Sequence, residues 1–170
     1  MLADMALRHA VISSPVGHLT VVRTTEGVCG LYMVTTKRPL NPERIGVRDD
    51  AVADGVAGQL AEYFRGERRC FDVPLDLGGT AFQRRVWEAL LRIPYAGRVS
   101  YLQIAKELGD PHAVRAVGAA NGSNPVGIIV PCHRVVASNG ALTGYAGGIE
   151  RKKFLLDLEE RVAGRQPGLF

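Results

Sequence analysis

The sequence predicts a two-domain α/β protein, with a strand-containing N-terminal domain and a helical C-terminal domain. The chain has 170 residues, which is enough for two small domains. Short apolar segments separated by turn residues occupy the first part, whereas two capping boxes mark helices in the second. Gly78-Gly79 lies between them, where the charge balance changes, so we expect domains at residues 1–79 and 80–170.

Three short antiparallel strands are expected near the N-terminus, because apolar segments alternate there with Ser-Pro, Gly and Glu-Gly turn signals. The expected strands are residues 9–14, 18–24 and 28–34, followed by a polar loop at 35–48. A helix capped by Asp49 or Asp50 is predicted to run to Gly66. Residues 71–77 alternate apolar and polar, and Pro74 restricts this extended segment to the edge of a sheet.

The C-terminal domain is predicted to begin with three helices. They are expected at residues 81–91, 101–109 and 111–121, started by the capping boxes Thr80–Gln83 and Ser100–Gln103 and by Asp110-Pro111. The second and third of these have the dimensions of a helix-turn-helix. Ala105 is small where the helices must cross, and Gly109 suits the turn. An ordinary helical hairpin has the same spacing and is the alternative interpretation.

Composition and charge exclude several classes of protein. Apolar residues make up 46% of the chain and charged residues 22%, which excludes a disordered chain. No apolar run is long enough to span a membrane, and the first residues lack a signal-peptide core, so we expect a cytoplasmic protein that does not bind membranes. The three cysteines form no disulfide framework and are expected to be reduced thiols.

Positive charge is concentrated in the C-terminal half. Residues 1–79 hold 9 Lys and Arg against 10 Asp and Glu, whereas residues 80–170 hold 12 against 7. Seventeen of the 21 basic residues are Arg, which favours bidentate phosphate contacts, although a GC-rich genome would also favour Arg. Genomic bias does not explain the asymmetry between the halves, which indicates a surface that faces a polyanion.

The candidate chemical centre is the sequence Pro131-Cys132-His133-Arg134. We expect residues 126–130 to form an apolar strand, and a core strand is not ordinarily followed by these polar groups, so the segment is a candidate functional site. A thiolate at Cys132 would be a nucleophile. Adjacent side chains of a strand point to opposite faces, so His133 can assist Cys132 only if the chain turns at Pro131 or a water bridges the two. The alternative is a buried, inert cysteine, the interpretation that fits Cys29 and Cys70.

Metal and cofactor chemistry are not expected. The chain has no CxxC motif, and its four histidines form no ligand pair. Motifs that bind phosphate or dinucleotides are also absent from the sequence. We therefore predict no metal and no cofactor.

A series of motifs spans residues 80–160 without a gap. In chain order they are Phe82-Gln83, Val86-Trp87, Tyr101, Arg115 to Gly118, Asn121-Gly122, Asn124-Pro125, Pro131 to Val135, Gly144 to Gly148, and Glu159. The series resembles the 6-O-alkylguanine-DNA alkyltransferases, also called methylated-DNA–protein-cysteine methyltransferases. The resemblance implies a ribonuclease-H-like N-terminal domain and a C-terminal winged helix-turn-helix domain. Residues 1–79 match more weakly, and the cysteine positions that bind a structural zinc in some members are not reproduced.

The resemblance implies a catalytic role for five residues. Cys132 would accept the alkyl group, with His133 as its base through a bridging water and Glu159 orienting His133. Asn124 would hold the turn before the active-site segment, and Tyr101 would donate to N3 of the departing guanine. Without the resemblance, Glu159 would be interpreted as a surface glutamate and Tyr101 as a packing aromatic residue.

The resemblance also implies how DNA and the damaged base are bound. Arg115 would fill the gap left by the extruded base, and the small residues Ala116, Ala119 and Ala120 would let the helix enter the minor groove of double-stranded DNA. The pocket for the base would be lined by residues in two segments, namely Val135, Tyr145, Ala146 and Gly147. Without the resemblance, Tyr145 would be an ordinary loop aromatic residue.

The implied function is repair of DNA by direct reversal. The alkyl group of 6-O-alkylguanine, and of 4-O-alkylthymine, would pass irreversibly to Cys132, so a monomeric protein would be consumed after one reaction. Two other classes share some of these features. A Cys-His hydrolase or acyltransferase would share the nucleophile, and a DNA-binding regulator or damage sensor would share the helix pair.

Overall fold

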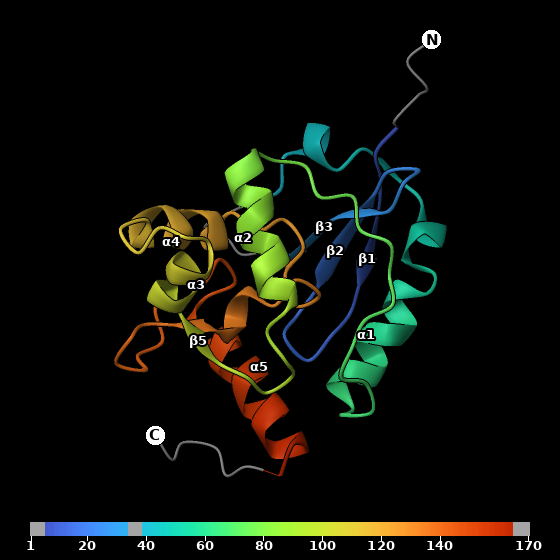
Figure 1. The fold of residues 1–170 in the computed structure, drawn as a ribbon. Coiled ribbons are helices and arrows are strands. Elements are labelled where there is room, and N and C mark those ends of the chain that lie inside the picture. Colours follow the sequence, from blue (N-terminus) through green and yellow to red (C-terminus); the bar gives the residue numbers. More distant parts are fainter. Residues whose placement is uncertain (1–5, 34–38, 165–170) are drawn as a thin grey trace. The chain divides into compact units, whose positions relative to one another are not determined.

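The computed structural model describes residues 6–33 and 39–164, and the chain divides into two compact units, Met1–Gly78 and Gly79–Phe170. The first unit consists of a sheet with one helix, and the second is mainly helical (Figure 1). The predicted α/β fold class is therefore confirmed. Among the described helices, none combines the length and apolarity needed to cross a membrane.

The N-terminal unit is built on a four-stranded sheet of order β3-β2-β1-β4. Strands β1 (Arg8–Ile12), β2 (Leu19–Arg23) and β3 (Val28–Met33) are consecutive antiparallel neighbours, which confirms the predicted meander. The segment predicted as a loop at 35–48 instead contributes β4 (Val47–Arg48), parallel to β1, after a short 3₁₀ helix, Pro42–Arg44. Residues 34–38 lie outside the described residues.

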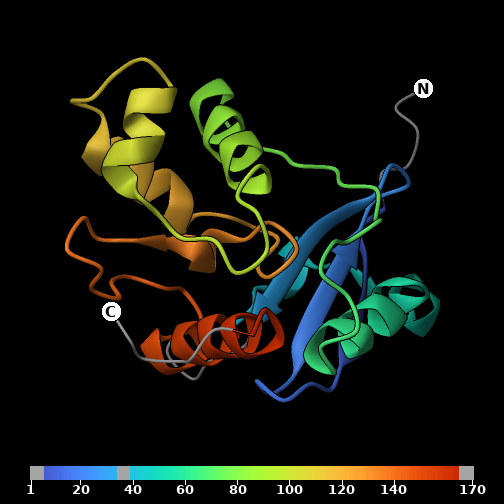
Figure 2. The ribbon, with the colours of Figure 1, turned by 60° about the horizontal axis from the view of Figure 1, so that its bottom comes forward.

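The α-helix of the N-terminal unit, green in Figure 2, lies beside this sheet. The expected single helix is divided into a 3₁₀ turn, Asp50–Ala53, capped by Asp49, and helix α1, Val56–Phe64. Gly55, at φ 80°, separates the two, because this backbone conformation is incompatible with a continuous helix. The predicted edge segment at 71–77 is confirmed, since Leu75 bridges to Val28 at the start of β3.

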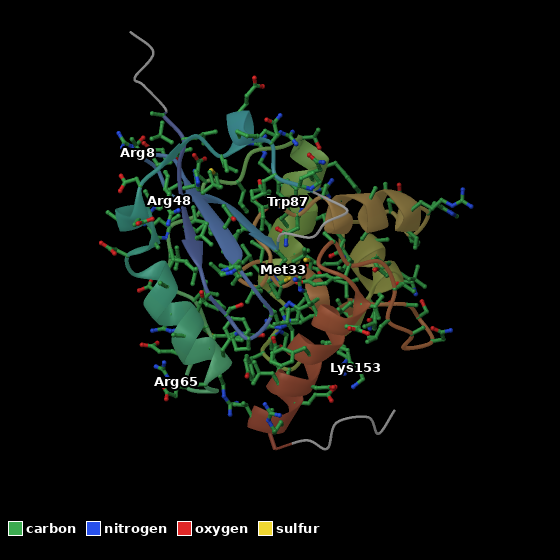
Figure 3. All side chains as sticks on the ribbon, turned by 180° about the vertical axis from the view of Figure 1, so that it is seen from behind. Arg8, Met33, Arg48, Arg65, Trp87 and Lys153 are labelled. Carbon is green, nitrogen blue, oxygen red and sulfur yellow. The ribbon has the colours of Figure 1, made fainter. Side chains whose placement is uncertain are left out.

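Four α-helices form most of the C-terminal unit. They are α2 (Ala81–Leu91), α3 (Tyr101–Glu107), α4 (Val114–Gly122) and α5 (Ile149–Val162). Both predicted capping boxes are present, at Thr80 and Ser100. The indole Nε1 of Trp87 on α2 (Figure 3) donates to the Ala120 carbonyl of α4 over 2.8 Å, which joins these two helices.

The helix pair α3 and α4 has the predicted helix-turn-helix features. Ala105 is fully buried, and Gly109 adopts φ 87° in the turn. The start of α4 was predicted three residues too early. Asp110 instead closes a separate turn, in which its side chain accepts from the amide of His112 and its carbonyl accepts from the amide of Ala113. The α-helix begins only at Val114.

The strand predicted at residues 126–130 is wrong. These residues form a buried turn in which the amide of Val130 donates to the carbonyl of Val126, and Ile128 adopts φ 69°. Buried turns and buried strands are both apolar, so the apolar composition of this segment did not distinguish between them. The strands of this unit are two-residue segments, β5 (Val99–Ser100) and β6 (Val135–Val136), which pair in parallel.

On α5 the side chains of Leu155 and Leu158 are buried, whereas that of Phe154 is exposed. The expectation that the cysteines outside the site are buried fails. Cys70 was expected to be buried and is exposed, and Cys29 is only half-buried.

Candidate active site

Cys132 opens a single 3₁₀ turn, Cys132–Arg134, directly after Pro131. The chain therefore leaves the extended conformation there, which is the condition that lets neighbouring side chains approach one another. The Cys132 amide donates to the carbonyl of Val130 over 2.8 Å, and the residue is 6% exposed. The turn thus holds a nearly buried thiol in a fixed backbone.

Asn124 braces the segment that leads to this turn. Its Oδ1 accepts from the amide of Val126 over 3.0 Å, and its Nδ2 donates to the carbonyl of Val130 over 2.8 Å. Burial raises the pKa of the Cys132 thiol, while a hydrogen bond from the Asn124 side chain and the charge of Lys152 lower it. Asn124 therefore affects both the shape of the turn and the thiol.

His133 and Glu159 form a fully buried pair between the turn and helix α5. The Nε2 of His133 lies 2.6 Å from Oε2 of Glu159. Burial lowers the pKa of His133, although the hydrogen bond and charge of Glu159 oppose this effect. The other ring nitrogen, Nδ1, is buried and has no hydrogen-bond partner among the described residues.

Glu159 accepts hydrogen bonds from other groups besides His133. Arg134 donates from Nε over 2.8 Å, and the backbone amide of Ala96 donates over 3.1 Å. Ala96 adopts φ 60°, a rare conformation for a residue other than glycine. Burial raises the pKa of Glu159, but the bonds and charges of His133 and Arg134 outweigh it and hold that pKa well below the ordinary range. Glu159 is thus ionised, and these hydrogen bonds fix the position of its carboxylate.

Lys152 is a site residue that sequence reasoning missed. It is fully buried, and its Nζ donates to the carbonyl of Val135 over 2.6 Å and to that of Thr143 over 2.9 Å. Burial lowers its pKa to about 8, partly offset by the charge of Cys132. One signal was available, because Lys152 lies three and seven residues before Leu155 and Glu159, on one face of α5.

Tyr101 is the first residue of α3, and Tyr145 lies in the loop before α5. The Tyr101 hydroxyl is 3.4 Å from Oγ1 of Thr143, and a Cβ placed on Gly118 of α4 would lie 3.9 Å from the Tyr101 ring. Burial, and then the charge of Cys132, raise the pKa of half-buried Tyr145. Beyond it, Ala146 is exposed and Gly147 is half-buried.

The backbone carbonyls of Cys132 and Val135 both accept hydrogen bonds within the C-terminal unit. The Cys132 carbonyl accepts from the amide of Val135 and from Nδ2 of Asn121, over 3.4 Å in the latter case. The carbonyl of Val135, which is fully buried, accepts from Lys152.

The outer face of α4 presents Arg115, Ala116 and Ala119, which are exposed. The expectation that Ala120 shares this face is wrong, because Ala120 is 3% exposed and its carbonyl accepts from Trp87 of α2. Among the exposed residues Arg115, Ala116 and Ala119, Arg115 has the one long side chain.

Within residues 6–33 and 39–164, no group of three or more His, Cys, Asp or Glu side chains is arranged to hold a metal ion. The three cysteines, all among the described residues, are free thiols.

Comparison with known proteins identifies the family. Residues 81–161 match the DNA-binding domain of 6-O-methylguanine DNA methyltransferase, and residues 7–77 match the ribonuclease-like domain of the same family. The chain belongs to the 6-O-methylguanine DNA methyltransferase family. Membership confirms the family inferred from the motifs around Cys132, as well as the predicted ribonuclease-like and DNA-binding domain types.

Members of the family from bacteria and archaea are similar over nearly the whole chain. A methylated-DNA–protein-cysteine methyltransferase of Mycobacterium tuberculosis is 48% identical over 165 residues, covering 96% of this chain and 99% of the relative. One from Methanosarcina acetivorans is 44% identical over 151 residues, covering 89% and 97%.

Solved structures of family members agree with the fold. The crystal structure of Mycobacterium tuberculosis O6-methylguanine methyltransferase has a TM-score of 0.85 and 47% identity, covering 95% of this chain and 96% of that one. A structure of the Mycobacterium tuberculosis protein in complex with DNA has a TM-score of 0.85 and 46% identity, covering 94% and 95%. DNA is therefore the partner that the C-terminal unit binds.

Proposed function

We propose that this protein repairs DNA by direct reversal, transferring the alkyl group of 6-O-alkylguanine, and of 4-O-alkylthymine, to Sγ of its own Cys132. Family membership supports the class of reaction. The observation that carries the choice of residue is the position of Cys132, a nearly buried thiol adjoining the buried His133–Glu159 pair. A nucleophile, a base and a group that orients the base then follow one another along the site.

The first step is removal of the thiol proton. Because Nε2 of His133 is bonded to Glu159, Nδ1 is the ring nitrogen left to accept a proton. We propose that Nδ1 takes the proton of Cys132 through a bridging water. Asn124 and Lys152 stabilise the resulting thiolate, since both lower the pKa of Cys132.

The second step is attack at a saturated carbon. The C–S bond forms as the bond from the alkyl carbon to O6 breaks, and the electron pair of that bond leaves with the guanine. Tyr101 assists by donating a proton or hydrogen bond to N3 of the base. The product on Cys132 is a thioether, which water does not hydrolyse under these conditions. Each molecule therefore acts once.

Alkyl transfer requires that the base leave the duplex, because a nearly buried thiol cannot reach a stacked base. Extrusion costs a few kcal/mol, and an inserted side chain offsets part of this cost. Arg115 is exposed on α4 beside the smaller exposed residues Ala116 and Ala119, which supports insertion from the minor groove. Val135, Tyr145, Ala146 and Gly147 line the proposed pocket for the extruded base.

The oligomeric state and the location belong to the same proposal. We expect the protein to act as a monomer in the cytoplasm, where a reactive thiol stays reduced. The free thiols of Cys29, Cys70 and Cys132 are consistent with that compartment.

Substitution of the acceptor tests the assignment. Cys132→Ala is expected to abolish methyl transfer from an oligonucleotide containing 6-O-methylguanine while preserving its binding, measured by fluorescence anisotropy. Cys70→Ser is the matched control, because Cys70 is exposed and lies in the other unit, and it should keep full transfer. Transfer by Cys132→Ala, or loss of transfer in Cys70→Ser, would refute the choice of acceptor.

A further inference from the structure

Arg134 contacts several groups around the candidate active site, although the proposed mechanism assigns it no role. It is 6% exposed, and its guanidinium donates to Glu159 from Nε over 2.8 Å and from Nη2 over 3.3 Å. Its Nη1 donates to the carbonyl of Ile93, just beyond the end of α2, over 2.8 Å. The guanidinium also lies 5.6 Å from the centre of the Tyr95 ring. These contacts fix both the position and the plane of the guanidinium.

Burial and the charges around Glu159 together set the protonation state of His133. The Glu159 carboxylate carries one negative charge, and the bidentate contact with Arg134 balances it with one permanent positive charge. A protonated His133, whose side chain is fully buried, would place a second positive charge beside the same carboxylate. That charge would also be repelled by the charge of Lys152. Burying an unbalanced charge is costly, so the neutral imidazole is favoured.

The hydrogen bonds then fix the tautomer. The Oε2 of an ionised Glu159 can only accept, so Nε2 of a neutral His133 must carry the proton. Nδ1 is left with a lone pair. A histidine in this form is a base, whereas an imidazolium could only act as an acid.

We propose that Arg134 is a positioning residue: by neutralising the carboxylate that orients His133, it keeps His133 uncharged, with its proton on Nε2 and a free lone pair on Nδ1. This inference deepens the proposed function. The statement that His133 acts as a base rests on that proposed function. The protonation state itself does not depend on any reaction.

Other groups around His133 do not replace Arg134. The charged and titratable groups that act on it are Glu159 and Lys152 from α5 and Arg134 from its own turn, and Cys132 precedes it. Tyr145, from the loop before α5, interacts electrostatically with Cys132 and Glu159. The segment after α2 contributes the Ala96 amide and the Ile93 carbonyl, which carry no charge, and its Arg98 is paired with Glu160. Lys152 donates to two backbone carbonyls, whereas Arg134 donates to Glu159 itself.

The unsubstituted protein gives the first test. The chain has only four histidines, so the ring nitrogens of His133 can be assigned by nitrogen-15 NMR with His133→Gln as the reference. The expected result at pH 7 is a neutral ring protonated on Nε2. An imidazolium at pH 7, or a neutral ring protonated on Nδ1, would overturn the proposal.

Variants of Arg134 give the second test. Arg134→Met and Arg134→Gln, the latter retaining polar donors, should raise the pKa of His133 by about one unit or more. Arg134→Lys keeps the charge and should leave that pKa close to its original value. If either neutral variant folds, by circular dichroism, with the pKa of His133 unchanged, the proposal is wrong. If neither folds, the NMR result on the unsubstituted protein decides.

The readout separates this inference from the proposed function. A merely structural role for Arg134 would slow methyl transfer equally at every pH. The proposal instead predicts that, in Arg134→Met and Arg134→Gln, the acid limb of the rate–pH profile shifts to higher pH together with the pKa of His133. Absence of methyl transfer from the unsubstituted protein would refute the proposed function and leave the NMR results on His133 unaffected.

Discussion

The Lys152 ammonium group is held by two carbonyls and lowers the pKa of the Cys132 thiol. Lys152→Met should therefore raise that pKa. Below the pKa, each unit of increase makes the thiolate about tenfold scarcer. The rate of Cys132 alkylation by iodoacetamide, followed from pH 6 to 10 in a Cys29→Ser, Cys70→Ser background, measures the shift.

Lys153 provides the matched control for this experiment. It is the next residue on α5 (Figure 3), but its side chain is 63% exposed and pairs with Asp157. Lys153→Met removes the same charge and should leave the alkylation profile unchanged. Equal profiles for Lys152→Met and Lys153→Met would show that the buried ammonium does not act on the thiol.

The sequence indicated some of these side chains and not others. Cys132 and His133 stand out because polar groups follow an apolar run. Glu159 and Lys152 do not, because charged residues on a helix ordinarily face solvent. Only packing reveals that both lie on the buried face of α5. The resemblance to a family supplied Glu159, whereas Lys152 and the contacts of Arg134 emerged only from the structure.

Helix α4 has one face toward solvent and one toward α2, and two neighbouring alanines distinguish them. Ala119 is exposed and Ala120 is buried beside Trp87. Ala119→Leu should change the free energy of unfolding by no more than about 0.5 kcal/mol but weaken DNA binding, because the bulkier side chain keeps the helix from the groove. Ala120→Leu should instead destabilise the protein by about 1–3 kcal/mol through overpacking.

Urea unfolding and fluorescence anisotropy with a DNA duplex measure the two effects separately. DNA binding by Ala119→Leu that equals the binding of the unsubstituted protein would show that this face of α4 does not meet DNA.

Element prediction succeeded where local chemistry decides the structure. The capping boxes at Thr80 and Ser100 fixed the starts of α2 and α3. It failed at residues 126–130, because a buried turn braced by Asn124 has the same apolar composition as a strand. It also failed at the start of α4, where an Asp-Pro pair closes a turn instead of capping the helix.

The stability of the protein should depend on pH through Glu159. Its pKa lies well below the ordinary value of 4.5, so in acid the unfolded chain binds a proton more readily than the folded one. The stabilisation is therefore present above about pH 4.5 and is lost as the pH falls. Glu159→Gln should lower the free energy of unfolding by roughly 3–5 kcal/mol at pH 7, because Arg134 is left buried without its counterion.

Urea unfolding between pH 3 and pH 7 measures this dependence. The unsubstituted protein should lose stability more steeply than Glu159→Gln as the pH falls. If stability falls equally with pH in the two proteins, the pKa of Glu159 is not lowered in the folded state.

The division of the chain followed from coarse features of the sequence. The Gly78-Gly79 pair and the change in charge led to a boundary expected after Gly79, and the two compact units meet between Gly78 and Gly79. The β4 pairing was missed, because two residues of an exposed strand leave almost no signal in composition or periodicity.

The most direct test of the proposed reaction is mass spectrometry of the protein after incubation with excess duplex DNA containing 6-O-methylguanine. The account predicts one methyl group for each protein molecule, found on the peptide that contains Cys132, with no further repair once every molecule is modified. Repair of many lesions by each molecule, or a methyl group on any other residue, would contradict it.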